Sequence, residues 1–238
     1  NGGMGVQFGV EFASSISSSC GSCTKFYVRV EVCRDPDGSG ALLEGNCQKY
    51  VPASGGKGVY KPIGLIQQYK DKMYFGAFGY LALNTADATD ANGVTNANKD
   101  GGVLRAMVQT VNNEMTETGA FIADPYNMLA AQGVSNSGTI NYLNKFGQAA
   151  KSYKHFDPVG EMYAEAIKYF KKLKPTASYI SGLNATLKDG FPVFTEWNDP
   201  AADAKYPKKG ALSCKKNYII GIGDTNSNYD WNLSGTPY

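Results

Sequence analysis

The chain has 238 residues, of which 42% are hydrophobic, and this is enough for one large domain or two small domains with a real core. Its 23 Lys and Arg residues nearly balance its 21 Asp and Glu residues, which argues against nucleic acid or an anionic membrane surface as a partner. No apolar run approaches the roughly 20 residues that span a bilayer. We therefore expect no membrane insertion, and any export signal is expected to be removed or to lie outside this chain.

The cysteines indicate an exported protein that is held by disulfides. Four of them, Cys20, Cys23, Cys33 and Cys47, crowd the N-terminal fifth, and Cys214 stands alone. Cys20-x-x-Cys23 begins like a zinc site, but the wide spacing of the next two cysteines favours disulfides over zinc. Cys33 with Cys47 would close a short loop. Cys20 or Cys23 could bond to Cys214, which leaves one odd thiol.

The first predicted elements are a strand, a helix and a strand. Residues 24–33 alternate apolar and polar side chains with the period of a strand. Pro62 and the apolar spacing within residues 60–71 predict a helix, and the uncharged run 73–81 predicts a second strand. This order indicates an α/β layer arrangement.

Two long tracts lack periodicity. Residues 84–100 are rich in Asn, Thr, Ala and Asp, and residues 112–140 are irregular, so we expect an insertion over about 84–140 that runs over the surface. The connection 175–213, which contains Gly and Pro, is a second predicted insertion. The predicted organisation is a single domain over residues 1–238 with a Cys-rich N-terminal segment, 1–50.

The segment that follows Asp157-Pro158 carries the clearest helix signal. Asp157 is a residue type that caps helices, and Pro158 suits the first helical position. One apolar stripe at helical spacing consists of Val159, Tyr163, Ala166, Phe170 and Leu173. Lysines gather near the C-terminus of this helix, where the helix dipole favours cations. These are Lys168, Lys171, Lys172 and Lys174.

The uncharged run 217–223 ends abruptly in a cluster of oxygen-bearing side chains that begins with Asp224. Such a run predicts a strand that is buried on both faces of a mainly parallel sheet. Because open α/β sheets bind ligands beyond the carboxyl ends of their strands, Asp224 is a candidate ligand or metal contact. The alternative is that Asp224 and Asn226 cap a turn.

Eight segments in the same order resemble the PilC/PilY family of type IV pilus tip adhesins. They are residues 24–33 (TKFYVRVEVC), 42–50 (LLEGNCQKY), 60–80 (YKPIGLIQQYKDKMYFGAFGY), 100–105 (DGGVLR), 134–147 (VSNSGTINYLNKFG), 153–170 (YKHFDPVGEMYAEAIKYF), 189–200 (DGFPVFTEWNDP) and 214–228 (CKKNYIIGIGDTNSN). The resemblance implies an α/β, von Willebrand factor A-like domain with a Rossmann-like, mainly parallel sheet flanked by helices, and a C-terminal β-propeller outside this chain. It also implies an extracellular pilus-tip protein that contacts minor and major pilins, promotes pilus assembly and attaches to host-cell or abiotic surfaces.

The same resemblance implies a candidate site for Ca²⁺ or Mg²⁺. A von Willebrand A domain binds its metal through an Asp-x-Ser-x-Ser loop, a Thr and a later Asp, and Asp224 corresponds to the last of these. The nearest match to the loop contains Asp37 and Ser39, but Ala41 stands where the second Ser is required. The predicted site is therefore a degenerate one, since a hard cation needs several converging oxygens. The alternative is a solvated turn between two cysteines.

The sequence gives little support for an enzyme. His155 is the only histidine, so triads and metal sites that depend on histidine have almost nothing to draw on. Glu196 and Asp199 flank Trp197, a combination that a secreted carbohydrate-active enzyme or lectin could use, although packing is the expected role of Trp197. We expect a non-enzymatic adhesin and assembly factor. The alternatives are that enzyme or lectin, or a purely structural filament-tip subunit that accepts strands from pilins.

Overall fold

The computed structural model describes residues 30–82, 99, 101–148, 157–202, 214–223, 230 and 233. The chain divides into two compact units. The first comprises Asn1–Leu65 with Glu117–Gly119, and the second comprises Ile66–Thr116 with Ala120–Tyr238.

The first unit is built on a short antiparallel hairpin. Strand β1 (Cys47–Tyr50) pairs with β2 (Val59–Pro62), with Cys47 opposite Pro62 and Tyr50 opposite Val59. A disulfide joins Cys33 to Cys47 across a sequence separation of 14 residues. Because so short a hairpin has little core of its own, this cross-link is a main restraint on the unit.

The second unit contains a second antiparallel pair of strands. Strand β3 (Phe75–Gly79) pairs with β4 (Val103–Gln109), with Gly79 opposite Val103 and an irregular register around Ala77. The helical elements of the described chain are α1 (Leu65–Gln68), η2 (Asn112–Glu114), α2 (Met128–Gln132), α3 (Thr139–Lys145), α4 (Val159–Phe170), α5 (Ala177–Ile180) and α6 (Ala185–Lys188). Among them, α3 and α4 contact this pair of strands.

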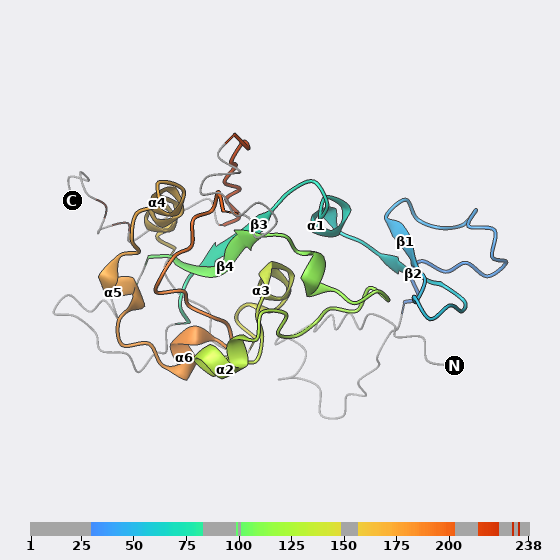
Figure 1. Cartoon of the computed structure of the whole chain (residues 1–238), viewed down its shortest axis with the longest axis horizontal. Coiled ribbons are helices and arrows are strands. Elements are labelled where there is room, and N and C mark those ends of the chain that lie inside the picture. Colours follow the sequence, from blue (N-terminus) through green and yellow to red (C-terminus); the bar gives the residue numbers. More distant parts are fainter. Residues whose placement is uncertain are drawn as a thin grey trace, which may run out of the picture. The chain divides into compact units, whose positions relative to one another are not determined.

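Helices α3 and α4 lie on opposite sides of the β3–β4 pair (Figure 1). Successive side chains of a strand point to opposite faces. Ala77 accordingly packs in a cluster with Tyr142 of α3, and its neighbour Phe78 makes an edge contact with Tyr169 of α4. A second buried cluster consists of Leu81, Val103, Tyr179, Leu187 and Val193. The core of this unit is therefore a three-layer packing of helix, two strands and helix.

The predicted mainly parallel sheet is wrong. Both sheets in the described part of the chain are antiparallel and two-stranded, so the Rossmann-like, von Willebrand A-like architecture is not present there. The run 217–223, which was expected to be a buried strand of that sheet, forms no strand and is exposed. Neighbouring strands of a parallel sheet run in the same direction and need crossover connections, whereas β1–β2 and β3–β4 are both antiparallel pairs.

Several local predictions are confirmed. The predicted strand within 73–81 is β3, and the predicted helix after Asp157-Pro158 is α4. The predicted helix over 60–71 is wrong in its first part, since Pro62 ends strand β2 and only α1 is helical. Most of the predicted strand 24–33 and most of the insertion 84–100 lie outside the described residues.

The tract 112–140 lies at the surface over residues 115–133, as predicted, but Glu114 near its start and residues 137–140 at its end are buried. It includes η2, α2 and the start of α3, and Glu114 within it is completely buried. Glu114 accepts hydrogen bonds from the backbone N–H groups of Thr139 (2.9 Å) and Ile140 (2.8 Å) and from the Tyr126 hydroxyl (3.1 Å). Gly138 precedes α3 at φ +92°, and a Cβ there would stand 2.8 Å from the Glu114 carboxyl carbon. One buried carboxylate thus ties the first turn of α3 to η2.

Candidate functional site

The buried face of α4 carries two glutamates. Glu161 and Glu165 are 1% and 3% exposed, and their spacing of four residues places them one turn apart on one face of the helix. The apolar stripe predicted for this helix is therefore wrong in part, because Tyr163 and Leu173 on it are about half exposed, at 53% and 51%. Acidic residues are rarely buried without partners, so the contacts of these two decide what the face can do.

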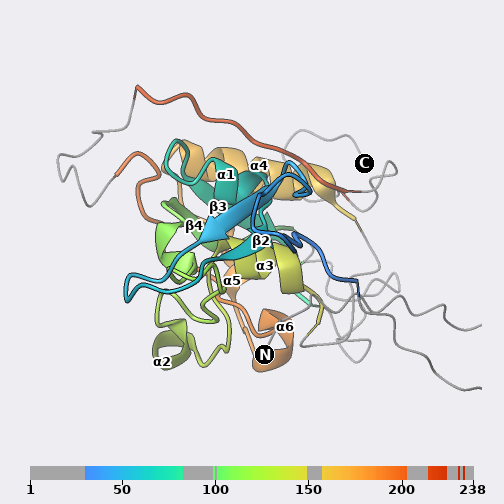
Figure 2. The same ribbon diagram turned by 90° about the vertical axis from the view of Figure 1, so that its right-hand side faces the viewer.

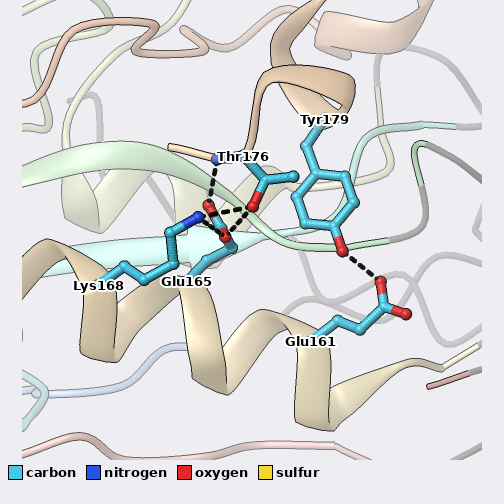
Figure 3. Close-up of polar contacts among 5 residues, drawn as sticks. All are labelled: Glu161, Glu165, Lys168, Thr176 and Tyr179. Atoms are coloured by element: carbon cyan, nitrogen blue, oxygen red, sulfur yellow. Dashed lines mark hydrogen bonds and ion pairs between the residues drawn. The ribbon is translucent and has the colours of Figure 1, made fainter. Parts of the chain in front are cut away.

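Residues at and before α5 supply those partners, as Figure 3 shows. The Tyr179 hydroxyl donates to Glu161 Oε2 at 2.6 Å. Glu165 accepts from the backbone N–H of Thr176 at 3.0 Å, from the Thr176 hydroxyl, and from Lys168 Nζ at 2.7 Å. The two carboxylates are thus engaged by donors, and they fasten the α5 segment to α4. The two carboxylates hold neighbouring segments together through hydrogen bonds, and they do not have the arrangement of a general acid and base that face a substrate.

A second acidic group surrounds the first turn of α4. The carboxylate of Asp157 accepts a hydrogen bond from the Tyr80 hydroxyl at 2.7 Å, and the N-cap position of α4 is Pro158 instead of Asp157. Asp230, far along the chain, accepts from the backbone N–H of Glu161 at 2.9 Å. Burial, together with the hydrogen bond and charge of Asp157, raises the pKa of Tyr80 above its usual range. Carboxylates at this end of a helix are stabilised by the helix dipole.

The run 217–223 ends beside Val159 and Asp157, at the start of α4. A Cβ on Gly223 would lie 3.7 Å from Val159 and 3.8 Å from Asp157 Oδ2. Asp224, the strongest metal candidate in the sequence, follows Gly223 directly but lies outside the described residues. Its predicted role in metal binding stays a prediction.

The other two predicted metal ligands lie in the first unit and contact each other. Asp37 Oδ1 accepts from the Ser39 backbone N–H at 3.0 Å and from the Ser39 hydroxyl at 2.8 Å, and the Ser39 oxygen also accepts from the Ala41 N–H. Ser39 lowers the pKa of Asp37 through these hydrogen bonds. Asp35 closes the same turn by accepting from the Gly40 N–H. These contacts form a solvated turn, and the role of Asp37 and Ser39 as metal ligands stays a prediction.

The cysteines show a related arrangement. Glu44 accepts from the Cys33 N–H at 3.1 Å and lies 3.1 Å from Cys47 Sγ, so these three residues have the spacing of a metal-binding cluster. They are not one, because the two sulfurs are bonded to each other. Cys214 is an exposed free thiol, and Cys20 and Cys23, its proposed partners, lie outside the described residues.

The residues of the carbohydrate hypothesis do not converge on one cleft. Trp197 packs edge-on against Phe78 and Tyr169, with ring centroids 5.9 and 5.5 Å apart. Glu196 is exposed to solvent, and Asp199 forms an ion pair with Lys172 at 2.7 Å. Trp197 therefore has the packing role that was expected for it. His155 lies outside the described residues.

Sequence reasoning missed the buried Arg105 of β4. Its guanidinium is 1% exposed and donates to the backbone carbonyl oxygens of Lys188 (2.9 Å) and Tyr80 (2.5 Å). It also lies over the ring of Tyr142, with Cζ 5.7 Å from the ring centroid. The sequence pattern that could have revealed this residue is a single charge inside the otherwise uncharged strand β4, Val103–Gln109. A buried charge of this kind requires partners, and Arg105 obtains them from the end of α6 and from the residue after β3.

Comparisons with known proteins identify the family. A family model described as "PilY1 homolog, second domain" matches residues 92–238. A protein of Xylella fastidiosa described as a type IV pilus biogenesis factor PilY1 homolog is 36% identical over 238 aligned positions, which cover 87% of this chain. The chain spans 17% of the length of that relative. No solved structure matches.

Among the helices that the structure describes, none combines the length and the apolar character that crossing a membrane requires. The family model covers more than half of the chain, and its description agrees with that of the Xylella fastidiosa relative. The resemblance seen in the eight sequence segments is thereby confirmed. The chain belongs to the PilY1-type family of type IV pilus factors.

Proposed function

We propose that this chain is a non-enzymatic part of an exported type IV pilus assembly factor that also attaches the pilus tip to surfaces. In this role it contacts minor and major pilins, and it meets host-cell or abiotic surfaces outside the cell. The family membership supports the link to pilus biogenesis. The proposal goes beyond this link in three respects: adhesion, the position at the pilus tip and the extracellular location.

The non-enzymatic part of the proposal rests on the hydrogen bonds that the buried carboxylates accept from the protein. Glu114, Glu161 and Glu165 are the buried glutamates of the described chain, and each accepts hydrogen bonds from protein donors. A general acid or base must reach a substrate atom, and these carboxylates are turned toward their own backbone and hydroxyl partners. Their common effect is to join neighbouring segments of the second unit.

The disulfide supports export. Disulfides persist in oxidising compartments and at cell surfaces, and the Cys33–Cys47 bond closes a loop in a unit with few buried residues. A small hairpin that is strengthened in this way suits a protein that functions outside the cell.

A purely structural role at the filament tip is the second candidate, and the exposed apolar run 217–223 favours it. An exposed segment with unpaired peptide groups can pair with a strand of a partner protein. The secreted enzyme or lectin is not favoured, because Trp197 is occupied by aromatic packing and Asp199 by an ion pair.

A divalent cation is not part of the proposed function. Asp37 Oδ1 and the Ser39 oxygen accept hydrogen bonds within their own turn, which favours a solvated turn over a metal site. We expect Ca²⁺ and Mg²⁺ titration to leave the melting temperature of the chain unchanged, because only a ligand that binds the folded state raises it. A melting temperature that rises with Ca²⁺ in the wild type, but not in Asp224→Asn, would instead assign a cation to Asp224.

Adhesion can be tested with the purified chain. Beads coated with it are expected to attach to glass or to epithelial cells more often than beads coated with the heat-unfolded chain, and EDTA is expected to make no difference. Glu196→Gln serves as a folded control, since Glu196 is exposed. Equal attachment of folded and unfolded chains would count against an adhesive role while leaving the role in assembly open.

A further inference from the structure

The disulfide of the first unit has a carboxylate beside it. The loop that Cys33 and Cys47 close leads into β1 and is drawn in blue in Figure 2. Glu44 lies within this loop. Its Oε2 accepts a hydrogen bond from the Cys33 backbone N–H at 3.1 Å and lies 3.1 Å from Cys47 Sγ. The hydrogen bond therefore holds a negative charge against one sulfur of the disulfide.

The sulfur beside Glu44 is the more accessible of the two. Cys33 is 6% exposed, whereas Cys47 is half-buried. Thiol–disulfide exchange begins when a thiolate attacks one sulfur, and access decides which sulfur is attacked. A thiolate in solution would therefore attack Cys47 Sγ, form a mixed disulfide with it and release the Cys33 thiolate. A second thiolate would release Cys47, so that two small thiols supply the two electrons and water supplies the two protons.

The Glu44 charge opposes both ways of starting this reaction. A thiolate that attacks Cys47 Sγ comes close to the carboxylate, and two like unit charges about 4 Å apart in water repel enough to slow a reaction about fivefold. Attack on Cys33 would release the Cys47 thiolate next to the same carboxylate, which makes it a poor leaving group. Arg34 follows Cys33, but its guanidinium forms an ion pair with Glu31 at 3.5 Å, so its charge attracts a thiolate only weakly.

The chain also carries a thiol that can take part in exchange. Its 5 cysteines are an odd number, so they cannot all pair within one copy. Cys214 is an exposed free thiol. Exchange with such a thiol would remove the cross-link from a hairpin that has few buried residues. We propose that the Glu44 carboxylate protects the Cys33–Cys47 disulfide by repelling thiolates, so that the first unit keeps its cross-link in the presence of free thiols.

The rate at which this bond is reduced tests the proposal. The folded chain is incubated with a small thiol, alkylated and digested, and mass spectrometry follows the loss of the peptides that the Cys33–Cys47 bond joins. Glu44→Gln removes the charge and keeps an oxygen that can accept from the Cys33 N–H. With 3-mercaptopropionate, an anionic thiol, Glu44→Gln is expected to be reduced about five- to tenfold faster than the wild type.

A matched variant controls for the loss of one negative charge. Glu117 is an exposed glutamate of the same unit, and it too accepts a hydrogen bond from a backbone N–H, that of Ala53 at 3.2 Å. Glu117→Gln is expected to be reduced at the rate of the wild type. A Glu117→Gln rate that rises as much as the Glu44→Gln rate would overturn the proposal.

The charge of the attacking thiol separates repulsion from a loosened loop. Cysteamine carries an ammonium group beside its thiolate, so Glu44→Gln is expected to speed reduction by cysteamine less than about twofold. A loop that only opens more often would speed reduction by both thiols to the same extent. Equal acceleration with the two thiols would therefore overturn the proposal, and so would a Glu44→Gln rate with 3-mercaptopropionate equal to that of the wild type.

Discussion

Removing the Glu114 carboxylate should destabilise the second unit strongly. Glu114→Ala leaves the N–H groups of Thr139 and Ile140 without their acceptor at a fully buried position. Each orphaned buried donor costs about 1–3 kcal/mol, and the lost side chain adds a cavity, so we expect a loss of about 4 kcal/mol in the free energy of unfolding. For a protein of this length the melting temperature then falls by roughly 8–16 °C.

Differential scanning calorimetry measures this fall. Glu114→Gln retains an amide oxygen that can serve one of the two N–H groups, so its melting temperature should lie between those of the wild type and Glu114→Ala. Glu196→Gln makes the same chemical change at an exposed site and should leave the melting temperature unaltered. A Glu114→Ala protein that melts within about 2 °C of the wild type would refute the reasoning, because it would mean that water replaces the carboxylate without cost.

Three further changes have definite expected outcomes. Tyr179→Phe removes the hydrogen-bond donor of the buried Glu161 carboxylate and should cost about 1–3 kcal/mol in urea unfolding. Tyr163→Phe, at a position of α4 that is 53% exposed, should cost nothing measurable. Burial acts to raise the pKa of Asp124, but hydrogen bonds donated by Ser137 and by α2 lower it overall. The ionised Asp124 carboxylate therefore stabilises the fold above the unfolded pKa of about 3.9, and this stabilisation is lost as the pH falls through the folded pKa. Asp124→Asn should remove that part of the acid dependence of the melting temperature, and an acid dependence equal to that of the wild type would contradict this prediction. The double variant Cys33→Ser, Cys47→Ser removes the disulfide, whose loop closure stabilises the fold by about 3 kcal/mol. Amide exchange in β1 and β2 should then become faster, while amide exchange in β3 and β4 stays the same. Equal acceleration in both sheets would be evidence against two separate units.

The elements that could be predicted from the sequence are those decided by local patterns. Strand β3 follows from an uncharged run, and α4 follows from a proline at its start and a helical repeat of apolar residues. The buried face of α4 could not be predicted, because Glu161 and Glu165 are buried only where Tyr179 and the Thr176 segment reach them. Burial of a charged residue depends on partners that are distant in sequence, and no periodicity carries that information.

The same reason explains the tract 112–140. Its polar composition suggested a surface excursion, yet Glu114 and Asn141 within or beside it are buried with hydrogen-bond partners. Buried polar residues that are satisfied by backbone groups resemble loop residues in composition. Composition therefore placed residues 115–133 correctly at the surface and missed the buried ends of the tract.

The run 217–223 shows the opposite error. Its pattern is that of an inner strand, but the described structure provides no neighbouring strand for it, so the predicted parallel sheet is wrong for this chain. Local propensity and global structure disagree at this run more than anywhere else in the described chain, and such conflicts commonly mark functional sites or missing partners. Among the predicted metal ligands, Asp37 and Ser39 were found together in one turn, which their spacing of two residues allows.

The number of surface pili is the most direct test of the proposed function. A strain in which the complete protein lacks residues 101–202 in frame should carry far fewer pili per cell by electron microscopy than the parent strain, while the amount of pilin in the cell stays the same. Arg105→Met, which removes a buried guanidinium and its carbonyl contacts, should give an intermediate count. Unchanged numbers of pili in the deletion strain, with the shortened protein present at the parental level, would contradict the assignment of this chain to pilus assembly.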